Sequence, residues 1–241
     1  ELPFMMTNAE ATSRAYWEYV QTMAPDEFKD VQVLALQVHG PGVIHTAEKP
    51  IKSVADMKGV KMRAPTRQVT KLMASLGATP VGMPLPSIPD ALSKGTIQGC
   101  VIPWEVAPSV KVQELTKFHA EFDPAGGALY TTTFVMGMNK AKYASLPPDL
   151  KKIIDNNSGI NTSGWLGKTQ QAGDAAGRKA AVDHGNTIFT VSAAEAQDFR
   201  RKSRALEAEW VEDMNKKGFD GKKLLETART LIEKHTKTAK G

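Results

Sequence analysis

The sequence contains little cysteine and few aromatic residues. Of its 241 residues, only Cys100 is a cysteine, and 7% are Phe, Trp or Tyr. A single cysteine excludes an internal disulfide, and Cys100 lacks the spaced Cys and His neighbours that a zinc site or a redox pair requires. The sequence also lacks the run of about 20 apolar residues that a membrane-spanning helix needs.

The motifs of common enzyme classes are absent as well. There is no Gly-x-x-x-x-Gly-Lys-Ser/Thr phosphate loop, no Gly-x-Ser-x-Gly elbow, no His-Glu-x-x-His and no Gly-x-Gly-x-x-Gly after a strand. Catalysis therefore has no sequence signature. We expect a protein that is not an enzyme and that uses neither a cofactor nor a metal ion.

The formal net charge of +5 makes an acidic partner worth considering. The densest basic clusters lie at 200–204 and 216–223, and they alternate with acidic residues such as Glu207 and Glu212 along amphipathic segments. Mixed charges of this kind are typical of solvated helix faces. Nucleic-acid surfaces instead combine clustered basic residues with aromatic ones, so we expect no nucleic-acid partner.

Short strands and short helices alternate in the first 138 residues. Helical patterns cover 11–23, 66–76 and 87–93, the last with Ser87 as its expected N-cap. Strand patterns cover 31–38, 60–65, 79–81, 97–102 and 130–138. The alternation predicts an α/β fold. Later residues have helical patterns at 149–184, 193–217 and 222–238, with one more strand candidate at 187–191.

Arg63 and two histidines are candidates for a binding site. Arg63 ends the strand pattern 60–65, and a guanidinium presents a planar fork of donors that binds a carboxylate in a bidentate manner. An arginine at a strand end is also commonly a surface or salt-bridged residue. His39 and His45 flank a Gly-Pro-Gly loop after a strand, where binding residues are frequent, although each is otherwise an ordinary surface or satisfied polar residue.

Three stretches of the chain carry a family pattern. Residues 53–65 read Ser-Val-Ala-Asp-Met-Lys-Gly-Val-Lys-Met-Arg-Ala-Pro, 76–81 read Leu-Gly-Ala-Thr-Pro-Val and 91–99 read Ala-Leu-Ser-Lys-Gly-Thr-Ile-Gln-Gly. Their order and spacing resemble the signature region of TRAP transporter solute-binding proteins, the DctP family. That family shows D-x-K-G-x-K-x-R-x-P, a helix, G-A-x-P, A-L-x-x-G and a D-G strand. Residues 2–4 and 146–150 resemble further landmarks, so the resemblance extends along the chain.

The resemblance implies a two-lobed, periplasmic-binding-protein-like α/β fold of type II. The family's N-terminal segment is expected to be missing from one lobe, and the C-terminal region is expected to be rich in helix. Residues 1–38 would form the remainder of the first lobe, and 39–132 a second lobe that carries the anion-binding arginine. Residues 133–241 would supply the crossing strand, long helices and a return to the first lobe.

The resemblance also implies roles for single residues. Arg63 falls on the family's near-universal arginine, which binds the ligand carboxylate. Ile102 stands where many members have an asparagine that faces the ligand, and Trp104 is close by in the sequence. These apolar residues favour an aromatic or short aliphatic monocarboxylate. Trp104 either lines the pocket or packs in the core, and Tyr130 either lines the cleft or pairs in the sheet.

Ser87 is a further candidate to line the site. The family often has an acidic residue and an aromatic one just before A-L-x-x-G, whereas this chain has Ser87 and Pro89 there. The Asp of the family's D-G pair is Gln98 in this sequence.

The function that the resemblance implies is periplasmic capture of a small organic acid. The closed form would deliver the acid to a small and a large TRAP membrane subunit driven by an ion gradient. Two alternatives stay open from the residues alone. A ligand-binding sensor domain would need a membrane anchor or signalling domain beyond the ends of the chain. An enzyme on a binding-protein-like fold would need a clustered acid, base or nucleophile.

Overall fold

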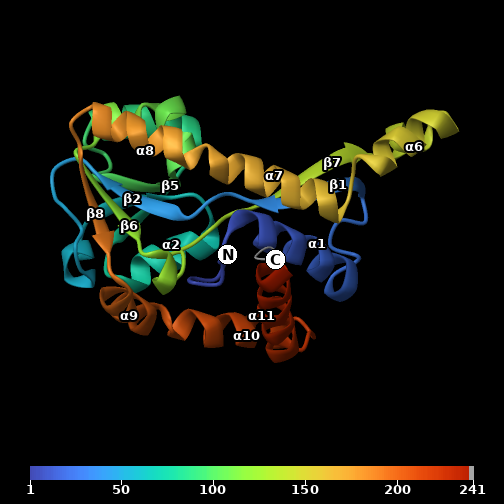
Figure 1. The fold of residues 1–241 in the computed structure, drawn as a ribbon. Coiled ribbons are helices and arrows are strands. Elements are labelled where there is room, and N and C mark those ends of the chain that lie inside the picture. Colours follow the sequence, from blue (N-terminus) through green and yellow to red (C-terminus); the bar gives the residue numbers. More distant parts are fainter. Residues whose placement is uncertain (239–241) are drawn as a thin grey trace.

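The computed structural model describes residues 1–238, which form two lobes, each built around its own sheet. The sheet of the first lobe has two antiparallel strands, β1 (Val31–Val38) and β7 (Thr133–Asn139). The sheet of the second lobe has six strands in the order β4-β3-β5-β2-β6-β8. In Figure 1 the helices α7 (Ile160–Ala172) and α8 (Asp174–Asp183) form a nearly continuous rod that runs along both sheets.

The remaining elements have the following bounds. The strands of the six-stranded sheet are β2 (Gly42–Thr46), β3 (Lys61–Ala64), β4 (Thr79–Gly82), β5 (Gly99–Pro103), β6 (Phe118–Phe122) and β8 (Thr187–Val191). The other helices are α1 (Ala9–Met23), α2 (Arg67–Ser75), α3 (Ile88–Ser93), α4 (Val112–Leu115), α5 (Lys140–Ala144), α6 (Pro148–Asn156), α9 (Ala193–Ser203), α10 (Ala205–Lys216) and α11 (Gly221–Thr238). Short 3-10 turns are η1 (Val54–Met57), η2 (Leu85–Ser87), η3 (Trp104–Val110) and η4 (Pro124–Gly126).

Local sequence signals set the boundaries of several elements. The Asn8 side chain accepts from the amide of Ala11 and starts α1, and the Thr66 side chain accepts from the amide of Val69 and starts α2. Gly77 ends the α2 region with a φ of 92°, a conformation that glycine adopts without steric cost. These caps confirm the two helices expected near 11–23 and 66–76.

Other sequence expectations are wrong in detail. The segment 39–45 is not a loop throughout, because β2 starts at Gly42 and His45 lies inside it. The strand β6 has no counterpart among the expected strands. Ser87 does not cap α3, because its own φ and ψ of −83° and −10° are already helical as the last residue of η2, whereas an N-cap residue needs an extended backbone.

The core of the second lobe lies on both faces of its sheet. Because strand side chains alternate between faces, Ile44 and Val101 point into a cluster with α2 and α9. Val43 and Ile102 point into the opposite cluster, with α3, η3 and α8.

The strand expected at 187–191 is confirmed as β8, and it pairs with β6 in this sheet. The lobe boundaries at 38/39 and 132/133 remain predictions.

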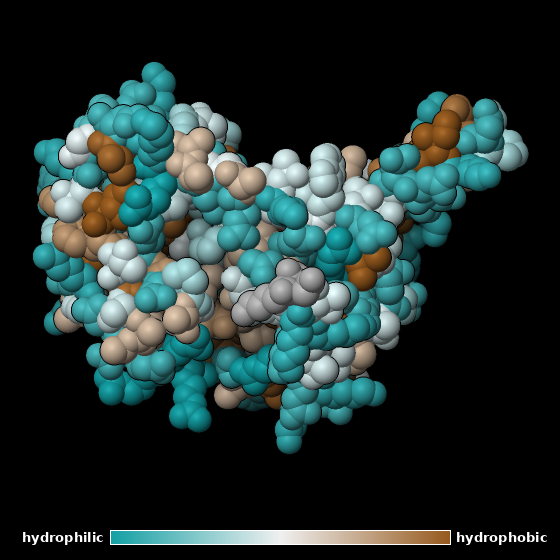
Figure 2. All heavy atoms as spheres, in the orientation of Figure 1, coloured by the Kyte–Doolittle hydropathy of each residue, from teal (hydrophilic) through white to brown (hydrophobic). Residues whose placement is uncertain are grey.

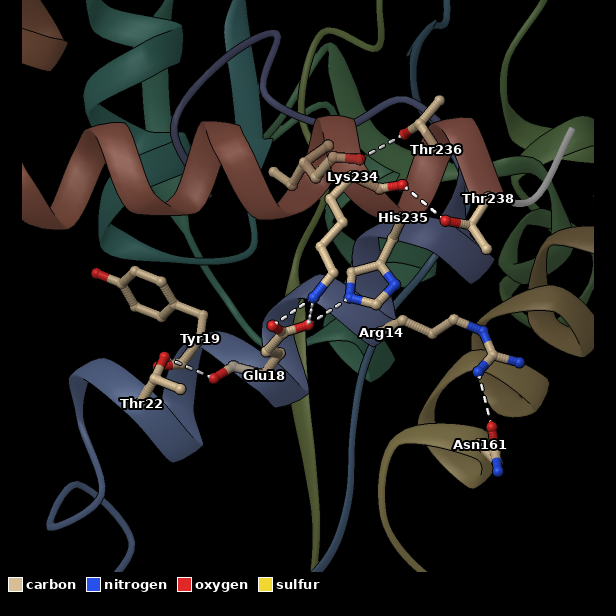
Figure 3. A network of polar contacts seen from close by, with 10 residues as sticks. Arg14, Glu18, Tyr19, Thr22, Asn161, Lys234, His235, Thr236 and Thr238 are labelled. Atoms are coloured by element: carbon tan, nitrogen blue, oxygen red, sulfur yellow. Dashed lines mark hydrogen bonds and ion pairs between the residues drawn. The ribbon is translucent and has the colours of Figure 1, made fainter.

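The C-terminal helix α11 packs against α1 in the first lobe. Glu18 of α1 accepts from Lys234 and from His235 of α11, each at 2.7 Å. Figure 3 shows this pair of contacts together with the hydrogen bond from Arg14 to Asn161 at the start of α7. The two ends of the described chain therefore meet around α1.

The first lobe leaves apolar side chains exposed on the β1–β7 sheet and on the arm that α6 forms (Figures 1 and 2). They are Val31, Phe134, Val135, Met136, Leu150 and Ile153. Among residues 1–238, no helix has the length and apolar character to span a membrane.

Candidate functional site

The candidate site lies at one edge of the six-stranded sheet. The strands β3 and β5 are parallel, so both end at this edge. The strand β2 begins there, because Gly42 is opposite Pro103 in the antiparallel pair of β2 and β5. In open α/β sheets the crevice outside the carboxyl ends of the strands is where ligands bind. The register thus defines an edge at which a ligand site is expected.

Three segments that cross between the lobes meet at this edge. Thr131, in the segment before β7, donates from its Oγ1 to the carbonyl of His39, at 2.9 Å, in the segment between β1 and β2. The third crossing is the junction of α7 and α8, where Asp174 begins α8. A Cβ on Gly40 would lie 2.2 Å from Asp174 Oδ2, so the segment between β1 and β2 is in close contact with the α7–α8 junction. Any change in lobe orientation must therefore act on these residues.

Arg63 lies near the end of β3 and is 4% exposed. Its Nε donates to the carbonyl of Met83 (3.1 Å) and its Nη1 to the carbonyl of Val101 (3.3 Å). No carboxylate in residues 1–238 forms an ion pair with Arg63, and its Nη2 donates to no protein acceptor in that range. Burial lowers the pKa of Arg63 from its usual value, which is the signature of an uncompensated buried charge.

Tyr130 lies across the same edge. Its carbonyl accepts from the amide of Gly42, at 3.0 Å, and the residue is 1% exposed. Tyr130 and Arg63 are close enough that the charge of each affects the pKa of the other. The structure therefore brings together Arg63 and Tyr130, two of the site residues that the sequence predicted.

His39 joins two of the crossing segments. Its Nε2 accepts from the amide of Thr132, at 3.1 Å, and its Nδ1 lies 2.5 Å from the carbonyl of Gly40. The tautomer that satisfies both contacts is neutral and carries its proton on Nδ1. Burial lowers the pKa of His39 to about 4, so the ring is uncharged at neutral pH. Both ring nitrogens of His39 are occupied.

His45 and Trp104 form a polar cluster on the β2–β5–β6 part of the sheet. The Nδ1 of His45 lies 2.7 Å from Nδ1 of His119, and the indole Nε1 of Trp104 donates to Glu121 at 3.1 Å. The Trp104 ring lies 5.1 Å from the His45 ring, centroid to centroid. Arg178 of α8 also binds Glu121, at 2.9 Å. The polar atoms of His45 and Trp104 are thus bonded to protein groups.

The remaining two candidates, Ile102 and Ser87, lie on segments next to those that bind Arg63. Ile102 is buried on β5, two residues after Cys100, which pairs with Arg63 in the sheet. Ser87 is half-buried at the end of η2, four residues after Met83, whose carbonyl binds Arg63.

Sequence reasoning missed His119, Glu121 and Asp174. His119 contacts His45 from 74 residues away, and no local pattern encodes that pairing. Asp174 accepts from the amide of Glu105, at 3.0 Å, and burial raises its pKa to about 6. No cluster of three or more His, Cys, Asp or Glu residues in the described part of the chain is arranged to hold a metal ion.

A family model described as bacterial extracellular solute-binding protein, family 7, or DctP, matches residues 1–213. The chain belongs to this family. The DctP resemblance inferred from the sequence is therefore confirmed, and with it the two-lobed α/β fold. As a family 7 member the chain is an extracytoplasmic solute-binding protein.

Solved structures of TRAP solute-binding proteins are very similar to this chain. A TRAP solute-binding protein from Rhodoferax ferrireducens, in complex with copurified benzoate, is 73% identical, with a TM-score of 0.98 over 99% of this chain and 74% of that one. A marine metagenome TRAP solute-binding protein, specific for aromatic acid ligands and in complex with metahydroxyphenylacetate, is 48% identical, with a TM-score of 0.95 over 98% and 74% of the two chains.

A more distant relative carries a transporter name. The outer membrane transporter protein TsaT of Comamonas testosteroni is 26% identical over 232 residues, which is 95% of this chain and 68% of TsaT.

Proposed function

We propose that this protein captures an aromatic monocarboxylate of the benzoate type outside the cytoplasm and passes it to a TRAP membrane transporter. One observation supports this proposal above the others: Arg63 is buried, and no carboxylate in residues 1–238 pairs with it. A buried charge without a partner is costly, and the ligand that compensates a guanidinium best is a carboxylate. The family and its solved relatives are consistent with that ligand class.

The surroundings of Arg63 favour an apolar body on the ligand. Cys100 and Ile102 follow on the neighbouring strand, both fully buried, and the protein partners of Arg63 are uncharged carbonyls. An apolar wall beside a single anion-binding group suits an acid with one carboxylate and a hydrophobic ring. The relatives crystallised with benzoate and metahydroxyphenylacetate support the same choice.

We infer a contact role for Arg63 and a supporting role for the other candidates. Ile102, Ser87 and His39 lie around the site edge, and we propose that they shape the cleft. The polar atoms of His45 and Trp104 are bonded to protein groups, so these two residues would hold the strands β2, β5 and β6 in register. Binding then closes the lobes because the ligand contacts both in the closed state only.

The partners in this proposal are the small and large membrane subunits of a TRAP transporter. The proposal includes no catalysis on the ligand. The ring nitrogens of His39, His45 and His119, the buried histidines near the sheet, all contact protein atoms. They are not free to act as a general base.

A thermal-shift titration tests the proposal. A ligand that binds only the folded chain at 100 times its Kd adds about 2.7 kcal/mol of stability, which for a chain of this size raises Tm by about 5–10 °C. Benzoate, 3-hydroxyphenylacetate and mandelate are compared with glucuronate and with neutral benzyl alcohol. We expect a shift with the aromatic acids alone.

The variant Arg63→Ala should lose this shift. The matched control is Arg201→Ala, which removes an exposed arginine of α9 that pairs with Asp198 on the surface. Arg201→Ala should keep the full shift. If Arg63→Ala also keeps it, the anion site lies elsewhere in the chain.

A further inference from the structure

The Tyr130 side chain is fixed in place by the crossing segments. A Cβ on Gly42 would lie 2.0 Å from the Tyr130 ring, so the ring packs directly on the backbone at the start of β2. The His39 ring meets it edge to face, with centroids 5.5 Å apart and an interplanar angle of 86°. The phenol therefore has one well-defined position at the sheet edge.

The hydroxyl of Tyr130 is buried and unpartnered. It has no hydrogen-bond partner in residues 1–238, although tyrosine hydroxyls in protein interiors nearly always have one. Leaving such a group unpaired is unfavourable, and no contact within the described residues compensates that cost. Tyr130 belongs to an apolar core cluster together with Leu129 and Ile44, in which a phenylalanine ring would pack equally well.

The free donor of Arg63 lies at the same edge. Its Nε and Nη1 are bonded to carbonyls after β4 and in β5, which leaves Nη2 as the donor without a protein acceptor in the described residues. Arg63 extends from β3 and Tyr130 covers the start of β2, with β5 between these two strands. Both side chains lie near the end of β5, because Arg63 donates to the carbonyl of Val101 and the Tyr130 ring packs on Gly42, which pairs with Pro103.

We propose that the Tyr130 hydroxyl donates a hydrogen bond to the carboxylate that Arg63 binds, so that the two residues form one anion subsite. This inference rests on the proposed function. A carboxylate accepts at both oxygens, which matches one charged donor and one neutral donor. Burial also raises the pKa of Tyr130, which keeps the hydroxyl protonated and able to donate.

The same arrangement links the ligand to lobe movement. Tyr130 belongs to the segment that crosses between the lobes, whereas Arg63 belongs to β3 of the second lobe. A carboxylate held by both residues connects the crossing segment to that sheet. Tyr130 therefore binds the carboxylate and also fixes the position of the segment before β7.

The variant Tyr130→Phe tests the inference by calorimetric titration with benzoate. Loss of a hydrogen bond to a charged acceptor should weaken binding about tenfold or more. The unliganded variant should melt at the same temperature as the wild type or higher, because an unpaired hydroxyl has been removed. Tyr143→Phe is the control: it removes a surface hydroxyl that donates to Asp155, and it should leave benzoate affinity unchanged.

The outcomes separate this inference from the proposed function. If the wild type binds benzoate, Arg63→Ala does not, and Tyr130→Phe binds as tightly as the wild type, the inference is overturned and the proposed function stands. A fall in Tm of unliganded Tyr130→Phe overturns it too, since the hydroxyl then has a structural partner. If the wild type binds no aromatic acid, both fail together.

Discussion

His45 and His119 face each other across β2 and β6, with their Nδ1 atoms 2.7 Å apart. The Nε2 of His45 lies 3.2 Å from the carbonyl of Ile102, and the Nε2 of His119 lies 2.9 Å from the side-chain nitrogen Nδ2 of Asn186. One proton arrangement satisfies all three contacts: Asn186 donates to His119, His119 to His45, and His45 to Ile102. The two rings are thus a neutral, fully bonded pair inside the sheet.

This pair should make the protein acid-sensitive. Burial lowers the pKa of His45 to about 3 and of His119 to about 4, from an ordinary value near 6.5. The unfolded chain therefore binds more protons than the folded chain below pH 6.5, and the stability held by the pair is lost as pH falls from there toward 3. We expect Tm to drop steadily between pH 6.5 and 4.

Substitution at His119 checks the source of that drop. His119→Asn removes one titrating ring, so its Tm should depend less on pH between 6.5 and 4 than the wild-type Tm does, even if its value at pH 7 is lower. The exposed His184 offers the control, since His184→Gln should leave the pH dependence as it is. Equal slopes in the His119 variant and the wild type would contradict the assignment.

The Asp174 carboxyl should act in the opposite pH direction. Burial raises its pKa to about 6, and its Oδ1 accepts from the amide of Glu105, at 3.0 Å. Because the folded pKa lies above the unfolded value near 3.8, its contribution to stability is present at low pH and is lost as pH rises through 6.

Asp174→Asn keeps an acceptor for the Glu105 amide and removes the charge. The variant should melt above the wild type at pH 8, and the difference should vanish near pH 4. Asp198→Asn, at an exposed position on α9, should show no such gain. Differential scanning calorimetry at the two pH values measures both effects.

The close approach of Gly42 to Tyr130 predicts a cost for any side chain at position 42. The ring must move to admit a Cβ that would lie 2.0 Å away, so Gly42→Ala should lower the free energy of unfolding by about 1–3 kcal/mol and weaken benzoate binding. Nothing lies within 4 Å of a Cβ on Gly82, so Gly82→Ala should stay within about 0.5 kcal/mol of the wild type. Urea unfolding of the two variants compares them directly.

Trp104 should matter for stability and not for ligand affinity. Its Nε1 donates to Glu121, and its ring packs on His45. Trp104→Phe removes one of several donors to the partly buried Glu121 carboxylate and should cost about 1–2 kcal/mol in unfolding free energy. Benzoate affinity measured by titration should be unchanged, and a large loss would instead place Trp104 in contact with the ligand.

Local patterns predicted part of the fold well. The strand β1 and the helix α2 follow from side-chain periodicity with a recognisable start and end, because each depends on neighbours within a few residues. The strands β2 and β6 were not predicted. Each is five residues long, and β6, Phe-His-Ala-Glu-Phe, carries two polar residues that find partners only across the sheet. Such strands are defined by long-range pairing rather than by their own pattern.

The candidate site was likewise predictable from the sequence only in part. Arg63 was nominated because its motif resembles that of a family, and its position at a strand end followed from local alternation. Its burial without a carboxylate partner, and the unpaired hydroxyl of Tyr130, depend on how β3, β5 and the crossing segments come together. The sequence holds no local trace of either property.

The crossing segments have a consequence for how such proteins diversify. Because the backbone passes from one lobe to the other through 39–41, through the segment before β7 and again at Gly173, neither lobe is a continuous stretch of sequence. A recombination event with one breakpoint therefore never transfers a complete lobe between related genes. Exchange of a whole lobe would need several breakpoints, whereas a point substitution at the shared edge needs none.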